Sequence, residues 1–149
     1  AQPQLATASV ADTRLSPLQP RTPARLPDRV LVLDDEADVR EAMSQLLHSH
    51  GIEAEVAANE AEAVTALQAS MEKLNPFALL ICDFRLADGV DGLQVGQALS
   101  QRFFNVPLLL ITGETAPERL QRVREAGVPV LFKPVSAERL LQAMTAAAS

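Results

Sequence analysis

The sequence contains no tryptophan, no tyrosine and a single cysteine, Cys82. An internal disulfide is therefore excluded, and the position of Cys82 inside an apolar run predicts a buried thiol in a reducing compartment. Aromatic residues make up 3% of the chain and hydrophobic residues 48%, so the core must consist of aliphatic side chains and five phenylalanines.

Long apolar runs are also absent. No stretch of the sequence reaches the roughly 20 apolar residues of a membrane span, and the first residues lack the basic-then-apolar order of a secretory signal. We therefore expect a soluble, cytoplasmic protein segment that makes no contact with a membrane.

Positive charge is scarce. The formal net charge is -6, from 13 basic and 19 acidic residues, and no arginine- or lysine-rich run offsets the total. Because surfaces that bind DNA or RNA need a basic patch, we expect no nucleic-acid partner. The acidity instead favours the binding of cations.

The first 28 residues differ from the rest. Residues 1–28 contain five of the ten prolines and no aromatic residue, which predicts a Pro-rich flexible linker or tail. They carry three arginines and two aspartates, so residues 29–149 keep ten basic and seventeen acidic residues and a net charge of -7. With 149 residues in all, we expect one folded domain over 29–149.

Short apolar or β-branched runs alternate with longer segments of helical spacing from Arg29 onward. The spacing predicts five strands and five helices, an α/β fold. The predicted strands are 29–34, 52–58, 76–83, 106–112 and 128–132. The helical stripes include Val39, Met43, Leu46, Leu47 and His50 in the first helix and Leu140, Leu141, Met144 and Ala148 in the last.

The strand patterns predict a parallel sheet. Strands 76–83 and 106–112 are apolar along their whole length, as is typical of strands covered on both faces, whereas 52–58 alternates and should lie at an edge. Right-handed crossovers then place helices on both faces of a five-stranded sheet, with the common flavodoxin-like order 2-1-3-4-5. In such sheets ligands bind beyond the carboxyl ends of the strands.

Polar residues stand at those ends. Asp34 and Asp35 follow the first strand, Asp83 ends the third, Thr112 ends the fourth and Lys133 follows the fifth. Taken singly, each could be a helix cap, a turn residue or a surface charge. Together, three carboxylates at one point repel one another, and a divalent cation such as Mg²⁺ relieves the repulsion. Thr112 and Lys133 would add a hydroxyl group and a positive charge, which makes a site for an anion beside the metal.

This succession of strand-end residues resembles the receiver domain of two-component response regulators over about residues 29–147. The resemblance implies that Asp83 accepts a phosphoryl group. It also implies that Asp35, Asp83 and the backbone carbonyl of Arg85 bind Mg²⁺, with Asp34 acting mainly through water.

The resemblance further implies that Thr112 and Lys133 bind the phosphoryl oxygens and that the Lys133-Pro134 peptide bond is cis. The phosphoryl donor would be a histidine kinase or a histidine phosphotransfer protein. We expect no turnover beyond phosphorylation and dephosphorylation of the domain itself, and the domain could form a homodimer.

Two departures from the family pattern bear on output. Val130 stands where an aromatic residue is usual, and Phe132, which we expect to point into the sheet packing, does not replace it. The loop "FRLADGVDGLQ" has Ala87 in place of a usual proline and one extra residue before Asp91. This loop resembles receivers at the carboxyl end of hybrid sensor histidine kinases, as do the Pro-rich tail and the end of the chain after the last helix. Such a parent protein could be membrane-tethered.

Two further pairs of residues need interpretation. Arg85 and Glu114 either form a salt bridge that hinders the hydrolytic water or are solvated charges. His48 and His50 are expected to be structural or helix-terminal residues, not phosphodonors.

Two other functions remain open at this point. One is a receiver-like interaction module that is never phosphorylated. The other is an Mg²⁺-dependent phosphatase with an aspartate nucleophile, which is disfavoured because Arg85 stands where its second aspartate is needed.

Overall fold

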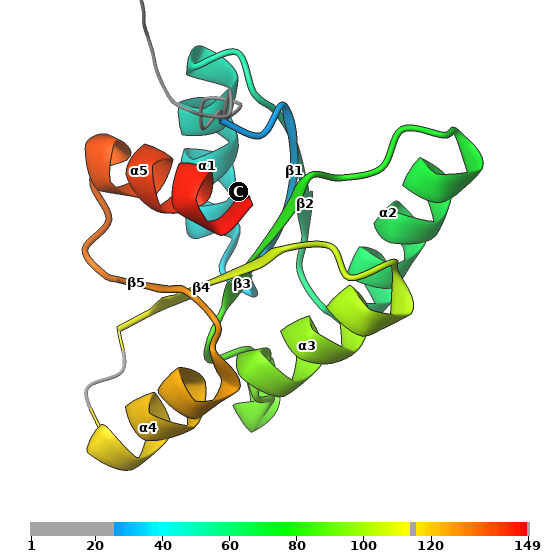
Figure 1. The fold of residues 1–149 in the computed structure, drawn as a ribbon. Coiled ribbons are helices and arrows are strands. Elements are labelled where there is room, and N and C mark those ends of the chain that lie inside the picture. Colours follow the sequence, from blue (N-terminus) through cyan, green and yellow to red (C-terminus); the bar gives the residue numbers. More distant parts are fainter. Residues whose placement is uncertain (1–25, 114–115, 149) are drawn as a thin grey trace, which may run out of the picture.

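The predicted alternation of strands and helices is the observed one. The computed structural model describes residues 26–113 and 116–148. Within them, five parallel strands form one sheet in the order β2-β1-β3-β4-β5 (Figure 1). The strands are β1 (Arg29–Leu33), β2 (Glu53–Ala57), β3 (Leu79–Asp83), β4 (Leu108–Thr112) and β5 (Val130–Phe132). The predicted fold class and strand order are confirmed.

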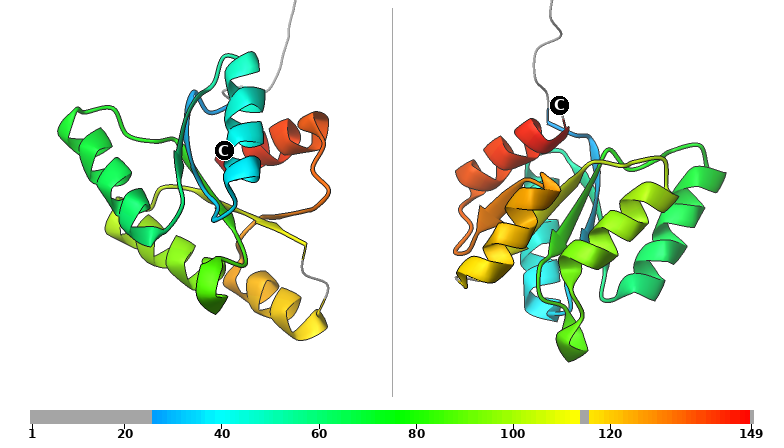
Figure 2. Two further views of the ribbon diagram at one scale, coloured as in Figure 1. Left: turned by 180° about the vertical axis from the view of Figure 1, so that it is seen from behind. Right: turned by 60° about the horizontal axis from the view of Figure 1, so that its bottom comes forward.

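Helices cover both faces of the sheet (Figures 1 and 2). The α-helices are α1 (Ala37–Ser49), α2 (Glu60–Glu72), α3 (Gly92–Arg102), α4 (Pro117–Ala126) and α5 (Ala137–Ala148), and a 3-10 turn η1 spans Ala87–Gly89. Side chains of α1 and α5 pack on one face, and those of α2 and α3 on the other. None of the helices in 26–113 and 116–148 is both long and apolar enough to cross a membrane.

Strand burial follows the predicted pattern. Every residue of β1, β3 and β4 is buried, as expected for parallel strands between two helical layers. The strand β2 is at one edge, where Glu53, Glu55 and Val56 are exposed. The predicted linker falls mostly on residues 1–25, which lie outside the described residues.

Arg29 lies at the amino edge of the sheet, where the strands begin. Its side chain is buried, and its guanidinium has several partners. Its guanidinium lies 3.4 Å from Glu53, pairs with Glu55 and donates to the carbonyl of Asn75 at 3.0 Å. The guanidinium carbon is 4.0 Å from the centre of the Phe77 ring. Two carboxylates, a carbonyl and an aromatic face therefore compensate one buried cation.

Two predicted orientations are wrong. His50 is exposed and not part of the buried stripe of α1, because the helix ends at Ser49 and the backbone then turns away. Phe132 is 39% exposed instead of packed into the sheet. It is the last residue of β5, the edge strand of the sheet.

Candidate functional site

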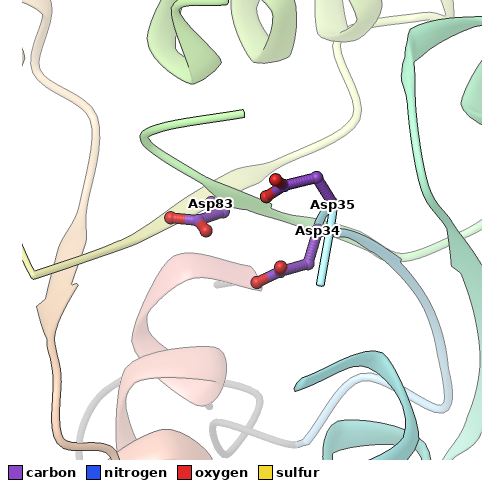
Figure 3. A group of neighbouring side chains, drawn as sticks. All are labelled: Asp34, Asp35 and Asp83. Atoms are coloured by element: carbon purple, nitrogen blue, oxygen red, sulfur yellow. The ribbon is translucent and has the colours of Figure 1, made fainter. Parts of the chain in front are cut away.

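The strand ends bring the predicted polar residues to one edge of the sheet. Register pairs Leu33 with Cys82 and Asp83 with Ile111, so the residues that follow β1 lie beside the end of β3. Figure 3 shows the carboxylates of Asp34, Asp35 and Asp83 close together at this edge. One ligand oxygen from each lies within 4.8 Å of the others.

Asp34 is held from three directions. Its backbone N–H donates to the carbonyl of Ala57 at 3.0 Å, and its own carbonyl accepts from the guanidinium of Arg40 at 2.8 Å. Its Oδ1 accepts from the N–H of Glu36 at 2.9 Å. This turn at the start of α1 fixes the buried carboxylate before any cation binds.

Asp83 is buried, but its carboxylate is held loosely. Lys133 Nζ lies 3.5 Å from Oδ2, and the N–H of Arg85 lies 3.4 Å from Oδ1. Both distances are long for hydrogen bonds, so the oxygens keep capacity for another partner. The backbone is better fixed, since the N–H of Phe84 donates to Ile111 at 2.9 Å.

Gly92 packs directly against the phosphoacceptor candidate. A Cβ at this position would lie 1.9 Å from the carbonyl oxygen of Asp83, which no side chain tolerates. The N–H of Gly92 donates to the carbonyl of Phe84 at 2.7 Å. The loop after β3 therefore returns tightly to the strand before α3 begins.

Burial and the neighbouring carboxylates raise the pKa values of two groups at this site. Burial raises the pKa of Asp34 to about 6, the carboxylates of Asp83 and Asp35 add to the rise, and the Glu36 N–H and Lys133 oppose it. Burial, followed by the charges of Asp83 and Asp34, also raises the pKa of the Cys82 thiol. Cys82 therefore stays a neutral buried thiol, as the sequence predicts, and is no nucleophile.

Thr112 and Lys133 complete the pocket. Thr112 is buried, and its carbonyl accepts from the N–H of Lys133 at 2.8 Å. The Lys133-Pro134 bond is cis, as the resemblance implies. A pocket of about 450 Å³ lies over this edge, lined by Asp35, Glu36, Asp83, Arg85, Thr112, Gly113 and Lys133.

The residues present fit Mg²⁺. Three carboxylates within 4.8 Å of one another offer only oxygen ligands, the donors that hard divalent cations prefer. The two basic residues of the pocket, Lys133 and Arg85, carry less charge than Asp34, Asp35, Asp83 and the neighbouring Glu36 together. The carbonyl of Arg85, the fourth expected ligand, belongs to the loop that leaves Asp83.

An apolar pocket of about 420 Å³ adjoins the acidic one, and sequence reasoning missed it. It lies between α1 and the start of the β5–α5 connection. Asp34, Asp83 and Lys133 belong to both the pocket wall and the acidic site. The remaining lining residues include Val39, Ala42, Met43, Leu46, Pro134 and Val135. The signal available in the sequence was the apolar stripe of α1, but such a stripe is interpreted as part of the core.

The other residues singled out in the sequence are not part of the acidic cluster. Glu114 lies outside the described residues, and so does its predicted salt bridge with Arg85. His48 and His50 are exposed at the end of α1, and the N–H of Ala54 donates weakly to His48 at 3.5 Å. Val130 is half-buried against the core on the α2 and α3 side.

Comparison with known proteins gives one consistent result. Residues 30–145 match the family described as response regulator receiver domain. The transcriptional regulatory protein TdiR of Thauera aromatica is 34% identical over 119 residues, which cover 79% of this chain and 50% of that protein. The C4-dicarboxylate transport transcriptional regulatory protein DctD of Rhizobium meliloti is 30% identical over 114 residues. That match covers 76% of this chain and 24% of DctD, so the chain spans about a quarter of that relative.

Solved structures agree with the fold. The chemotaxis protein CheY4 of Vibrio cholerae superposes with a TM-score of 0.68 at 29% identity, covering 80% of this chain and 97% of that one. NtrX from Brucella abortus gives a TM-score of 0.70 at 24% identity, covering 83% of this chain and 27% of that one. At that identity the second match supports the fold alone.

Proposed function

The chain belongs to the family of response regulator receiver domains, and on this premise we propose that it accepts a phosphoryl group from a phosphohistidine onto Asp83 in the presence of Mg²⁺. The observation that supports this best is the geometry of one carboxylate. Asp83 lies in the same cluster as Asp34 and Asp35 and 3.5 Å from the ammonium of Lys133.

The transfer is a displacement at phosphorus. A carboxylate oxygen of Asp83 forms the new P–O bond while the P–N bond to the donor imidazole breaks. The imidazole nitrogen keeps the bonding electron pair and takes a proton from solvent. The product is an aspartyl phosphate on a side chain that is already at the pocket wall.

Bound Mg²⁺ supplies positive charge that offsets repulsion between the carboxylates and the incoming phosphoryl oxygens. Asp35, Asp83 and the carbonyl of Arg85 would hold it directly, and Asp34 would act mainly through water. The turn at Asp34 holds the carboxylate of that residue in place in advance.

Thr112 and Lys133 would bind the transferred group. The ammonium of Lys133 can move from Asp83 to a phosphoryl oxygen with little change in position, because it already lies beside the carboxylate. The Thr112 hydroxyl would donate to another oxygen. The occupied site would thereby alter the loop after β4 and the contacts of the protein.

The donor protein would seat an apolar side chain in the apolar pocket between α1 and the β5–α5 connection. Asp83 and Lys133 are among the lining residues of this pocket, so a partner that fills it would bring its phosphohistidine close to the nucleophile. A small phosphodonor would need no such contact.

The parent protein is proposed to be a cytoplasmic, two-component signalling protein that uses this domain without nucleic-acid contact. A hybrid sensor histidine kinase, which could be membrane-tethered, is the proposed origin, on the resemblance of the β3–α3 loop. The relatives above carry the names of regulatory proteins, so full-length gene context is the direct test. Sedimentation with and without phosphodonor tests the homodimer.

The deciding experiment incubates the protein with acetyl phosphate and Mg²⁺ and measures its intact mass. A gain of one phosphoryl group that needs both Mg²⁺ and Asp83 supports the proposal. Steady release of phosphate with no stable gain would favour the phosphatase. No gain at all would favour an interaction module that is never phosphorylated.

A further inference from the structure

Helix α4 is attached to the rest of the domain by few side chains. Of its ten residues only Val123 is buried, whereas α3 has five buried residues. In Figure 1 and in the left view of Figure 2, α4 lies at the edge of the molecule. With so little apolar burial, any polar contact contributes a large share of what positions this helix.

One such contact is an ion pair from Arg122, on α4, to Asp91, the residue before α3. The guanidinium Nη2 of Arg122 meets Oδ2 of Asp91, and the two side chains are 51% and 25% exposed. An ordinary exposed pair of this kind stabilises little, because two mobile side chains must be ordered.

Asp91 is not mobile, however. Its Oδ1 caps α3 by accepting from the N–H of Leu93 at 2.9 Å and of Gln94 at 3.3 Å. The carboxylate is therefore already oriented when Arg122 binds. Partial burial acts to raise the pKa of Asp91, but the hydrogen bond from Arg122 and the two N–H groups hold that pKa below its usual value. Asp91 stays ionised throughout the neutral range.

Asp91 is also tied to the phosphoacceptor. It forms an isolated antiparallel bridge with Arg85, and the N–H of Gly92 donates to Phe84 at 2.7 Å. Gly92 in turn touches the carbonyl of Asp83 so closely that a Cβ cannot fit. A short chain of fixed contacts thus runs from Asp83 through Asp91 to Arg122.

This connection does not involve Thr112 or the position three residues before Lys133, where receiver domains usually have an aromatic residue. In this chain that position is Val130, whose short side chain is half-buried in the core on the α2 and α3 side. A β-branched side chain is restricted at χ1, and valine has no ring that could reorient. The loop after β3 offers α4 a separate link to the site.

We propose that the Asp91–Arg122 ion pair couples α4 to the phosphoacceptor loop, so that phosphorylation of Asp83 changes how firmly α4 is held. This rests on the proposed function, because it needs a phosphoryl group on Asp83. The pair is a positioning contact, and neither side chain touches the transferred group.

Amide hydrogen exchange of α4 tests the coupling. In the unphosphorylated protein we expect Arg122→Gln to speed α4 exchange about fivefold, the effect of roughly 1 kcal/mol. Adding acetyl phosphate and Mg²⁺ should change α4 exchange in the wild type and leave it unchanged in Arg122→Gln. Arg124→Gln is the matched control, because the Arg124 side chain lies on the same helix but hydrogen-bonds only to Gln121 among the contacts described.

Asp91→Asn separates coupling from folding. Asparagine also caps helices, so α3 should stay intact while the charge is lost. We expect this variant to behave as Arg122→Gln does and the double variant to be no worse than either, and 1 M NaCl should mimic both in the wild type.

The outcomes distinguish the two proposals. A wild type that gains no phosphoryl mass refutes the proposed function. A wild type that is phosphorylated, with an α4 response that persists in Arg122→Gln and in Asp91→Asn, refutes the coupling alone.

Discussion

The sheet has an amino edge, where its strands begin, and a carboxyl edge, where they end. The charged side chains at these two edges are paired in different ways. At the amino edge, buried Arg29 has two carboxylates, a carbonyl and an aromatic ring around it. At the carboxyl edge, three carboxylates lie within 4.8 Å of one another, and the Lys133 ammonium lies 3.5 Å from one of them, that of Asp83. The amino edge surrounds one buried cation with oppositely charged and polar partners, whereas the carboxyl edge gathers like charges.

The difference separates an edge whose charge pairing stabilises the fold from an edge whose carboxylates suit a cationic ligand. A buried charge with a full set of partners is costly to disturb, because removing one member strands the others. A cluster of like charges costs free energy until a counter-ion or a proton arrives. The carboxyl edge is therefore the part of this domain that a ligand can stabilise.

The largest expected effect comes from removing the nucleophile. Asp83→Asn should abolish the gain of phosphoryl mass with acetyl phosphate and Mg²⁺, since an amide oxygen does not displace the donor. Intact mass measures the result, and Asp88→Asn, an exposed change in the same loop, should leave the gain intact. A full phosphoryl gain by the Asp83→Asn variant, at whatever residue, would disprove the assignment.

At the amino edge, a substitution should destabilise the fold without affecting phosphorylation. Arg29→Met keeps most of the aliphatic volume but removes the ion pairs and the hydrogen bond to Asn75. We expect a loss of about 2 kcal/mol in the free energy of unfolding, measured by urea denaturation. Normal phosphoryl gain in the folded variant is the control. An unchanged stability would mean that Arg29 is not needed there.

The apolar pocket should matter only for a protein donor. Ala42→Glu places a charge at an exposed position of α1 that lines this pocket. We expect about tenfold slower transfer from a phosphorylated histidine phosphotransfer protein, equivalent to about 1.4 kcal/mol, and an unchanged rate with acetyl phosphate.

The matched control is Ala61→Glu, the same change at an exposed position of α2. Equal slowing by both variants would point to net charge. Equal slowing with both donors would point to a damaged active site. Either result would remove the docking role of the pocket.

The smallest expected effect concerns pH. The pKa of Asp34 is raised to about 6 from 3.8, so the folded protein binds this proton more tightly than the unfolded chain. Without Mg²⁺, the contribution of Asp34 should therefore raise stability as pH falls from about 6 to about 4. Thermal unfolding of the wild type and Asp34→Asn in EDTA measures it.

Asp34→Asn should be the more stable protein at pH 7, by about 1 kcal/mol, with the difference shrinking as the pH approaches 4. Asp38→Asn, an exposed change on α1, is the control. A wild type that is more stable than Asp34→Asn at pH 7 in EDTA would show that the ionised, buried Asp34 does not destabilise the fold.

Much of the site was predictable because the end of a strand is visible in the sequence as an apolar run that stops at a polar residue. Runs of Leu, Val and Ile end on Asp83 and Thr112, and parallel strands bring their carboxyl ends to one edge whatever the loops do. Orientation at the ends of elements was less predictable. His50 and Phe132 have the right spacing for burial, but each lies where its element stops and its cover ends.

The sequence by itself determined the alternation of strands and helices, the parallel order and the gathering of Asp34, Asp35, Asp83, Thr112 and Lys133, since these follow from periodicity and from residues adjacent in the chain. Only the tertiary structure decided which distant charges meet. Glu53 and Glu55 turn to Arg29, and Asp91 meets Arg122 across 31 positions. The first set depends on the register of β1 against β2, and the second on where α4 lies relative to the start of α3, which the packing of the whole core sets and no local pattern records.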